Sequence, residues 1–461
     1  MLEDLLTPCK ALFAPGVHTE LRGQNNRTRR VVLLSGDVLS NVRSDVSGIS
    51  ARVYKNGVWG FSSMAEYSAE AAGKVLKAAT ENASFMGRHA GNDQGALSPV
   101  KTGCFPASAE LRDPAQKIYV DAAKEIDEYV AAHCPKLKSR RIVATEDSME
   151  KLLAVSDGTD AHIAAPRSYV YVILSAETDA GAPVELFQAF GGKGTFDCNF
   201  ADPSAYYEKI DALYERLMQK REGVYADAGE KTVILGGMMT GMLSHEAVGH
   251  TVEADLVLGG SVAAHNLHTP VASELVTLTD FAHTAFGETC PLPVYVDDEG
   301  TEAKDVPLIE NGILTGYMNS RESAHHFGMQ PGGNARAWLF SDEPLIRMRN
   351  TSVHPGKDKL EDMIASVDDG YYLIDSGNGQ ADTTGEFMFG VTMGYEIKGG
   401  KLGKALLDTT ISGVAFEMLR TVDMVSDKVV WTSSGFCGKK QPMPVGMGGP
   451  ALRCKVKIGG R

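Results

Sequence analysis

GMMTGMLSHEAVGHTVEADL, residues 237–256, is the stretch from which the fold of the second half of the chain is predicted. Its pattern predicts a helix near 240–256. The segment is apolar except for His245, Glu246, His250 and two following acids. Ionisable groups on an apolar helix need a reason to be there, because burying them unpaired costs free energy. The pattern H-E-x-x-x-H therefore makes His245 and His250 candidate metal ligands. Two histidines at this spacing also arise by chance, and that alternative stays open on these residues alone.

The spacing of the two histidines carries a structural prediction. Residues five apart lie about 140° apart around a regular α-helix, so their imidazoles cannot converge on one ion. We therefore predict a local widening of the helix, such as a π-bulge, between His245 and His250. Gly249 is expected to ease that distortion. Glu253 and Asp255 follow closely and are candidates for orienting the imidazoles.

Outward from this segment, residues 226–461 are rich in glycine and in alternating strand-like runs. The predicted strands include ENGILTGYM (310–318), YYLID (371–375), FMFGVTMGYEIKGGKL (387–402) and LRCKVKIGG (452–460). We expect this part to be a β-rich C-terminal domain that carries one metal-binding helix.

Residues 1–225 mix both kinds of element. The Asn56-Gly57 step predicts a β-hairpin. Helices are predicted over 65–85, 113–133 and 203–222, with Asp113 as the N-cap of the second, and strands over 140–148, 168–177 and 183–192. The fold class expected for the whole chain is α+β, with an N-terminal mixed α/β domain that has a possible subdivision near 87–112.

Charge and composition exclude several classes of protein. The 461 residues carry 45 Lys and Arg against 59 Asp and Glu, a net charge of −14, which disfavours nucleic-acid binding. No apolar run approaches the ~18 residues that span a bilayer, and the N-terminal segment lacks the pattern of a signal peptide. The seven cysteines are scattered, without a C-x-x-C pair, as expected of reduced thiols. We expect a cytoplasmic protein without a membrane partner.

HEAVGHTVEAD (245–255) resembles the signature of the TldD/PmbA family of zinc metallopeptidases. Further matches follow in order: VDDEG (296–300), MRNT (348–351), GYYLID (370–375) and GFCGKKQPMPVGMGGPALR (435–453). One branch of the family, TldD-like, keeps the metal motif, and this chain resembles that branch. The resemblance implies that His245 and His250 bind Zn²⁺ and that Glu246 is the general base.

The third metal ligand has several candidates. The family pattern places a cysteine near the C-terminus in a G-x-C-G-K context, which here is Cys437. Gly435 and Gly438 flank it and are expected to let the backbone turn tightly. Glu253 and Cys454 are the rivals. Without the resemblance, Cys437 would be interpreted as a buried core thiol.

The resemblance also implies an activity and partners. We expect a zinc-dependent peptidase that hydrolyses unfolded or unstructured peptides and pairs with a homologous subunit, either as a homodimer or with a relative that lacks the motif. The alternative is a non-catalytic modulator or binding protein with a structural metal site or none, because the family also carries a label of gyrase modulator. Tyr371, Tyr372 and Tyr395 are candidates for oxyanion stabilisation. Arg349 and Asn350 either hold backbone near the site or form a surface ion pair and a turn cap.

Overall fold

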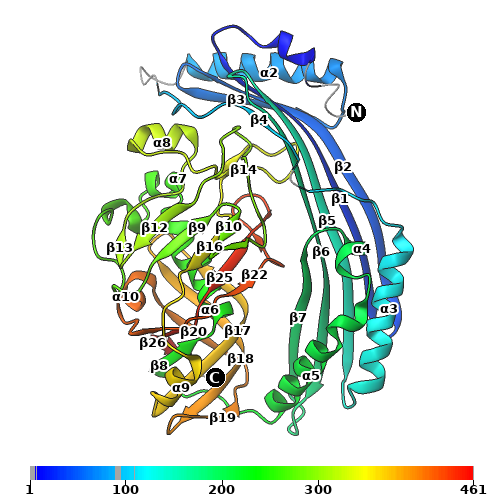
Figure 1. The fold of residues 1–461 in the computed structure, drawn as a ribbon, viewed down its shortest axis with the longest axis vertical. Coiled ribbons are helices and arrows are strands. Elements are labelled where there is room, and N and C mark those ends of the chain that lie inside the picture. Colours follow the sequence, from blue (N-terminus) through cyan, green and yellow to red (C-terminus); the bar gives the residue numbers. More distant parts are fainter. Residues whose placement is uncertain (1–5, 7, 89–94, 108, 460–461) are drawn as a thin grey trace.

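The computed structural model describes residue 6 and residues 8–88, 95–107 and 109–459 (Figure 1). Its first sheet uses only strands that precede residue 194, in the order β3-β2-β1-β5-β6, with β4 and β7 both pairing with β6. The strands are β1 (His18–Leu34), β2 (Asp37–Lys55), β3 (Val58–Met64), β4 (Cys104–Phe105), β5 (Ser139–Val155), β6 (Asp160–Glu177) and β7 (Pro183–Lys193). Several of these strands are long, and together they curve beside the second half of the chain (Figure 1).

Helices cover one face of this sheet in two places. Helix α2 (Ala69–Gly87) packs on β2 and β3, and Ser68 caps its first turn by accepting a hydrogen bond from the backbone N–H of Ala71. Helices α3 (Gln116–His133) and α5 (Tyr207–Arg221) share a second apolar core with β1, β5, β6 and β7. Shorter helical segments are η1 (Lys10–Leu12), α4 (Phe196–Asn199) and η2 (Pro203–Tyr206).

The local predictions for this half are largely confirmed. Asn56 and Gly57 both have positive φ, 54° and 76°, and they connect β2 to β3 as a tight hairpin. The predicted N-cap of α3 is wrong. The helix begins at Gln116 without a side-chain cap, and the Asp113 carboxylate instead accepts hydrogen bonds from Arg29 and Arg43.

The second half contains a closed ring of five strands. Strand β17 pairs with β8, β8 with β26, β26 with β20, β20 with β18, and β18 with β17 again. The bounds are β8 (Gly229–Leu235), β17 (Asp369–Ala381), β18 (Glu386–Lys398), β20 (Thr409–Val414) and β26 (Leu452–Ile458), with β19 (Lys401–Ala405) and β21 (Met424–Val425) attached. The predicted strands at 371–375, 387–402 and 452–460 belong to this sheet.

A six-stranded sheet lies beside the ring, in the order β13-β12-β9-β16-β25-β22. Its strands are β9 (Leu278–Phe281), β12 (Val306–Glu310), β13 (Ile313–Leu314), β16 (Asn350–Val353), β22 (Val430–Thr432) and β25 (Gly446–Gly449). Helix α6 (Gly237–Met242) and the helical turns that follow it contact β16 and β25 of this sheet and β17 of the ring. The segment predicted to carry the metal site therefore sits in the largest apolar core of the molecule.

Short elements complete this half. They are α7 (Ala254–Leu258), η5 (Val262–His265), β10 (Thr284–Ala285), β11 (Glu288–Thr289), α8 (Arg321–Phe327), β14 (Ala335–Arg336), β15 (Leu345–Ile346), α9 (Leu360–Ala365), α10 (Ala415–Arg420), β23 (Phe436–Cys437) and β24 (Met443–Pro444). Together with the two large sheets they confirm the predicted α+β class. No helix in the described ranges combines the length and apolarity needed to cross a membrane.

Buried acids of the VDDEG segment tie the two halves together. The Asp298 carboxylate accepts hydrogen bonds from Lys151 Nζ at 2.7 Å and from Arg22 Nη1 at 3.2 Å, both on the first sheet. Glu299 pairs with Arg52 of β2. The predicted boundary at residues 225/226 stays a prediction, as does the subdivision near 87–112, of which residues 89–94 and 108 lie outside the described part.

Candidate metal centre

The helix that carries the two histidines changes its hydrogen-bonding pattern between them. It runs as α6 to Met242, continues as a π-helical turn, η3 (Leu243–Gly249), and tightens to a 3₁₀ turn, η4 (His250–Val252). The extra residue in the wide turn brings the two imidazoles to the same side, with 5.2 Å between their ring centroids. The π-bulge predicted from the five-residue spacing is confirmed.

Gly249 is needed at this turn because a side chain would not fit there, and not because its backbone adopts an unusual conformation. Its φ is −54°, an ordinary helical value, so the expected conformational role is wrong. A Cβ at this position would lie 2.1 Å from Met348 Sδ and 3.0 Å from the carbonyl oxygen of Ser244. The absence of a side chain lets the π-helical turn pack directly against Met348, which is buried in the same core.

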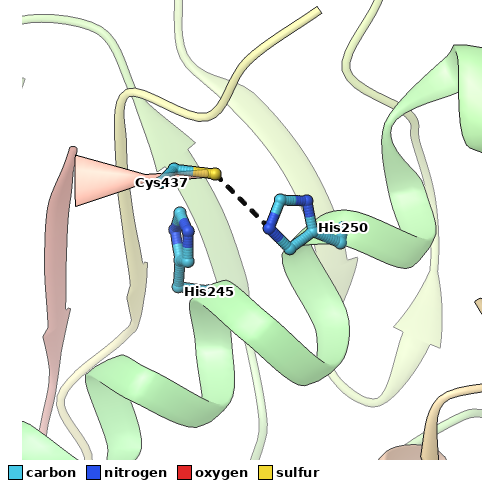
Figure 2. A group of neighbouring side chains, drawn as sticks. All are labelled: His245, His250 and Cys437. Carbon is cyan, nitrogen blue, oxygen red and sulfur yellow. Dashed lines mark hydrogen bonds between the residues drawn. The ribbon is translucent and has the colours of Figure 1, made fainter. Parts of the chain in front are cut away.

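Three predicted side chains converge at this turn. One ligand atom from each of His245, His250 and Cys437 lies within 4.8 Å of the other two, and among the described residues this is the one such group of His, Cys, Asp or Glu. Figure 2 shows both imidazoles rising from the helix toward the sulfur, which lies 3.4 Å from His250 Nε2. Both ring nitrogens of His245 are buried without a hydrogen-bond partner in the described structure. A bound metal ion would satisfy one of them.

Cys437 is positioned by a short hairpin whose backbone is fixed by hydrogen bonds. It ends β23, which pairs with β24. The guanidinium of Arg347, fully buried, donates hydrogen bonds to the carbonyl oxygens of Cys437, Lys439 and Gln441 at 2.9, 2.5 and 2.9 Å. Arg347 was not identified from the sequence. Its position next to the MRNT segment does not indicate that its guanidinium binds carbonyl oxygens of a hairpin about 90 residues away in sequence.

The glycines beside Cys437 do not have the expected role. Neither Gly435 nor Gly438 has a positive φ, and no atom of the described residues lies within 4 Å of a Cβ built on Gly438. The left-handed residue of this hairpin is Lys440, with φ of 57°. The bend of this hairpin therefore depends on the left-handed conformation of Lys440 and on the hydrogen bonds that Arg347 donates to the carbonyl oxygens of the hairpin.

Glu253 orients His250 from the far side of the ring. Its Oε2 lies 2.7 Å from His250 Nδ1, so a proton on Nδ1 leaves Nε2 free to face Cys437. Lys439 Nζ lies 3.2 Å from the same carboxylate oxygen and donates to Asp255 at 2.8 Å. Glu253 thus acts as the predicted orienting partner, whereas Asp255 contacts Lys439 and not an imidazole.

The charges around the three side chains favour a bound cation. Burial raises the pKa of the Cys437 thiol, but the neighbouring imidazoles of His245 and His250 outweigh it and lower this pKa to about 4. Burial lowers the pKa of His250, but hydrogen bonds to Cys437 and Glu253 outweigh it and raise this pKa to about 10. The thiolate is the form of cysteine that binds metals, and the negative surroundings of His250 attract positive charge.

Glu246 stands beside both imidazoles without joining the three converging groups. Its carboxylate oxygens lie 3.9 Å from His245 Nε2 and 3.7 Å from His250 Nε2. The side chain is about one quarter exposed, whereas that of His245 is almost fully buried. A carboxylate in this place can exchange protons with a molecule that enters the site.

The remaining candidates lie elsewhere. Cys454 is buried in β26, opposite Val233 of β8, and burial raises its pKa, as expected of a core thiol. Of the three tyrosines, Tyr371 accepts a hydrogen bond from the backbone N–H of Asp227, and Tyr395 donates one to Gln219. Tyr372 packs at the edge of another apolar cluster.

Arg349 and Asn350 of the MRNT segment fix neighbouring backbone by hydrogen bonds, which is the first of the two interpretations given above. Arg349 is fully buried, pairs with Asp280 at 2.8 Å and donates hydrogen bonds to the carbonyl oxygens of Gly332 and Lys304. Asn350 bridges to the carbonyl oxygens of Phe281 and Leu292. The alternative of a surface ion pair is wrong.

Comparisons with known proteins identify the family of the chain. The profile of the PmbA/TldA metallopeptidase C-terminal domain matches residues 228–460, and that of PmbA/TldA metallopeptidase domain 1 matches residues 19–83. A "Metalloprotease" of Methanothermobacter thermautotrophicus is 30% identical over 96% of this chain and 95% of its own. A "Zinc metalloprotease TldD homolog" of Saccharolobus solfataricus is 36% identical over 54% of this chain and 56% of its own. The crystal structure of TldE from Thermococcus kodakarensis superposes over both full chains with a TM-score of 0.75 at 18% identity, which shows a shared fold.

Proposed function

Since the chain belongs to the TldD/PmbA metallopeptidase family, we propose that it is a zinc-dependent peptidase whose reaction takes place at His245, Glu246, His250 and Cys437. The observation that carries the proposal is the convergence of two imidazoles and a thiol beside a partly exposed carboxylate. His245 adds specific support, because both of its buried ring nitrogens lack a hydrogen-bond partner among the described residues.

The donor set fits zinc. Two imidazole nitrogens and one thiolate are ligands that zinc accepts, and three protein ligands leave the open position typical of catalytic sites. His245, His250 and Cys437 would hold the ion. When bound, zinc supplies a Lewis acid that activates water and polarises a carbonyl group.

In the proposed mechanism, Glu246 moves the proton. Its carboxylate faces the space between the two imidazoles and accepts the proton of the attacking water. Glu246 then delivers that proton to the departing amine. Glu253 keeps the proton of His250 on Nδ1 throughout, which fixes the orientation of that ring.

The burial of the site favours an unstructured substrate. His245 and Cys437 are 1% and 2% exposed, so a peptide bond held inside a folded domain would not reach them. An extended or unfolded segment presents its backbone without such obstruction. We therefore assign unfolded or unstructured peptides as the substrate class.

Metal analysis combined with a cleavage assay tests the proposal. We expect one zinc ion per chain, cleavage of an unfolded casein substrate, loss of cleavage in a chelator and recovery on adding zinc. A metal ion held by four protein ligands, with no cleavage of unfolded substrates, would instead identify the non-catalytic modulator.

A further inference from the structure

Strand β6 has an unpaired stretch between its two outer partners. Strand β4 pairs with Asp160 and Ala161 near one end of β6, and β7 pairs with the part from Arg167 to Glu177 (Figure 1). On its other side, β6 pairs with β5 without interruption from Asp160 to Ser175. Residues 162–166 therefore form a short open edge inside the sheet, which we call the β6 gap. Among the described residues, no strand pairs with this edge.

The backbone of Ala164 faces the β6 gap. Within a strand, alternate residues point their N–H and C=O groups to the same side. The N–H of Asp160 donates to the carbonyl oxygen of Gly103, and the carbonyl oxygen of Pro166 accepts from the N–H of Gly194, both on the outer side of β6. Ala164 lies between them in the same alternation. It is only 5% exposed, and its N–H and C=O have no hydrogen-bond partner among the described residues. Buried backbone groups are normally paired, so these two require a partner.

A cavity of about 460 Å³ opens beside the β6 gap. Its volume falls within the range of ~300–1,000 Å³ that is typical of ligand sites. The walls come from both halves of the chain and are mainly apolar and aromatic. They include Met149 and Ala165 of the first sheet and Leu292, Val294 and Trp338 of the second half.

The lining of the cavity favours an extended, apolar peptide. Every buried charged side chain of the wall already has partners within the protein, as the ion pairs of Lys151 with Asp298 and of Arg167 with Asp147 illustrate. A ligand therefore meets apolar side chains and the free N–H and C=O of Ala164. An extended peptide carries the matching groups, because one of its residues can exchange both hydrogen bonds with Ala164 while its side chains enter the cavity.

The cavity and the metal centre lie on opposite faces of the hairpin that carries Cys437. Neighbouring residues of a strand point to opposite faces. Cys437 points to the two histidines, whereas Phe436 packs on Trp338 of the cavity wall, with 5.4 Å between the ring centroids. Pro444, the cross-strand partner of Phe436, also lines the cavity. A peptide segment in the cavity is therefore separated by this hairpin from the segment that is cleaved.

We propose that the cavity is a second binding site for the substrate, in which an extended apolar segment adds to β6 as a short strand opposite Ala164. The site holds an unfolded chain at a place remote from the bond that is cleaved. The identification of this peptide as a substrate rests on the proposed function, whereas its binding does not require cleavage.

Protection of a cysteine tests where the peptide binds. Cys198 is exposed and lines the cavity, whereas Cys104 is exposed and does not line it. The probe is the peptide Lys-Ala-Val-Ala-Val-Ala-Lys, added to the full Glu246→Gln chain so that it is not cleaved. At about nine times its dissociation constant it should slow the alkylation of Cys198 by N-ethylmaleimide about tenfold, because about one cavity in ten then stays empty. Alkylation of Cys104, followed by mass spectrometry in the same sample, should not change.

Two variants test how the peptide is held. Ala165→Phe should weaken binding more than about tenfold, because the ring occupies the space of the ligand. Ala164→Pro removes the outward N–H without breaking a hydrogen bond to β5, and should weaken binding about three- to tenfold. Ala189→Phe is the matched control, since Ala189 is partly exposed on the same face of the sheet, in β7, and does not line the cavity. Thermal stability equal to that of the unmodified chain shows that each variant folds.

Two results would overturn the proposal: Cys198 that the peptide does not protect, and protection that Ala165→Phe leaves unchanged. Kinetics of the zinc-loaded chain with Glu246 in place then test the link to cleavage, where Ala165→Phe should raise the KM for unfolded casein and leave kcat unchanged. Cleavage of casein without protection of Cys198 refutes the second site alone. Protection of Cys198 in a chain that cleaves no unfolded substrate contradicts the proposed function, and the cavity is then a peptide site without a role in cleavage.

Discussion

Glu253 Oε2 and His250 Nδ1 lie 2.7 Å apart, and the carboxylate is completely buried beside the imidazole that it orients. The pair lies on the opposite side of the imidazole from Cys437. It therefore fixes which nitrogen of His250 faces the thiol, and its effect should be visible in metal affinity.

Replacing Glu253 by Gln should weaken zinc binding by about 10–100-fold, because the amide no longer holds the Nδ1 proton with a charged acceptor. Competition with a chromophoric chelator measures the affinity. Asp255→Asn is the control, since Asp255 contacts Lys439 and not an imidazole. Equal affinity of Glu253→Gln and the unmodified chain would contradict the orienting role.

Cys437→Ser should abolish stoichiometric zinc binding, because the alcohol does not ionise at neutral pH as the low-pKa thiol does. Elemental analysis of the purified protein provides the measurement. Cys454→Ala is the matched control: it removes another buried thiol of the same core and should keep one zinc per chain. Full zinc content in Cys437→Ser would show that the third ligand lies elsewhere.

Glu246→Gln should lower cleavage of an unfolded peptide by about 10²–10⁴-fold while zinc content stays full, because the amide cannot accept the proton. Rates with a fluorogenic peptide and elemental analysis on the same sample separate the two effects. Glu288→Gln, at an exposed position, is the control. Cleavage that persists in zinc-loaded Glu246→Gln would assign the base to another residue.

Gly249→Ala should destabilise the fold by about 1–3 kcal/mol, because its Cβ collides with Met348 Sδ. Met348→Ala alone should cost about 2–5 kcal/mol through the cavity that it leaves. The double variant should cost less than the sum, since the added methyl group enters that cavity. Chemical denaturation of all three variants measures the coupling, and strict additivity would show that the two residues do not compete for the same space.

The sequence predicted those features whose causes are local. Two histidines five residues apart require a widened turn if they share an ion, and η3 provides one. The Asn56-Gly57 hairpin follows in the same way from the backbone preferences of two residues. The prediction of a helix over 113–133 is confirmed except for its first residues. Asp113 does not cap the helix, because its carboxylate accepts hydrogen bonds from Arg29 and Arg43, which lie on strands distant in sequence.

Features that depend on distant partners could not be predicted. The five-stranded ring joins β8 to β26 across more than two hundred residues, and strand patterns carry no information about such a pairing. Arg347 and Lys439 reach the surroundings of Cys437 and Glu253 only after the six-stranded sheet and the hairpin are in place. The role of Gly249 was misjudged for the same reason, since Met348 is distant in sequence.

The pairing of β26 with β8 also sets an order of events during synthesis. Strand β8 opens the half that carries the histidines, and its partner β26 is translated long after them, later even than Cys437. A growing chain therefore contains His245 and His250 before Cys437 and the strand that closes the ring have been made. If the chain is the proposed peptidase, its three proposed metal ligands come together only after β26 has been translated, so a nascent chain cannot cleave itself at this centre.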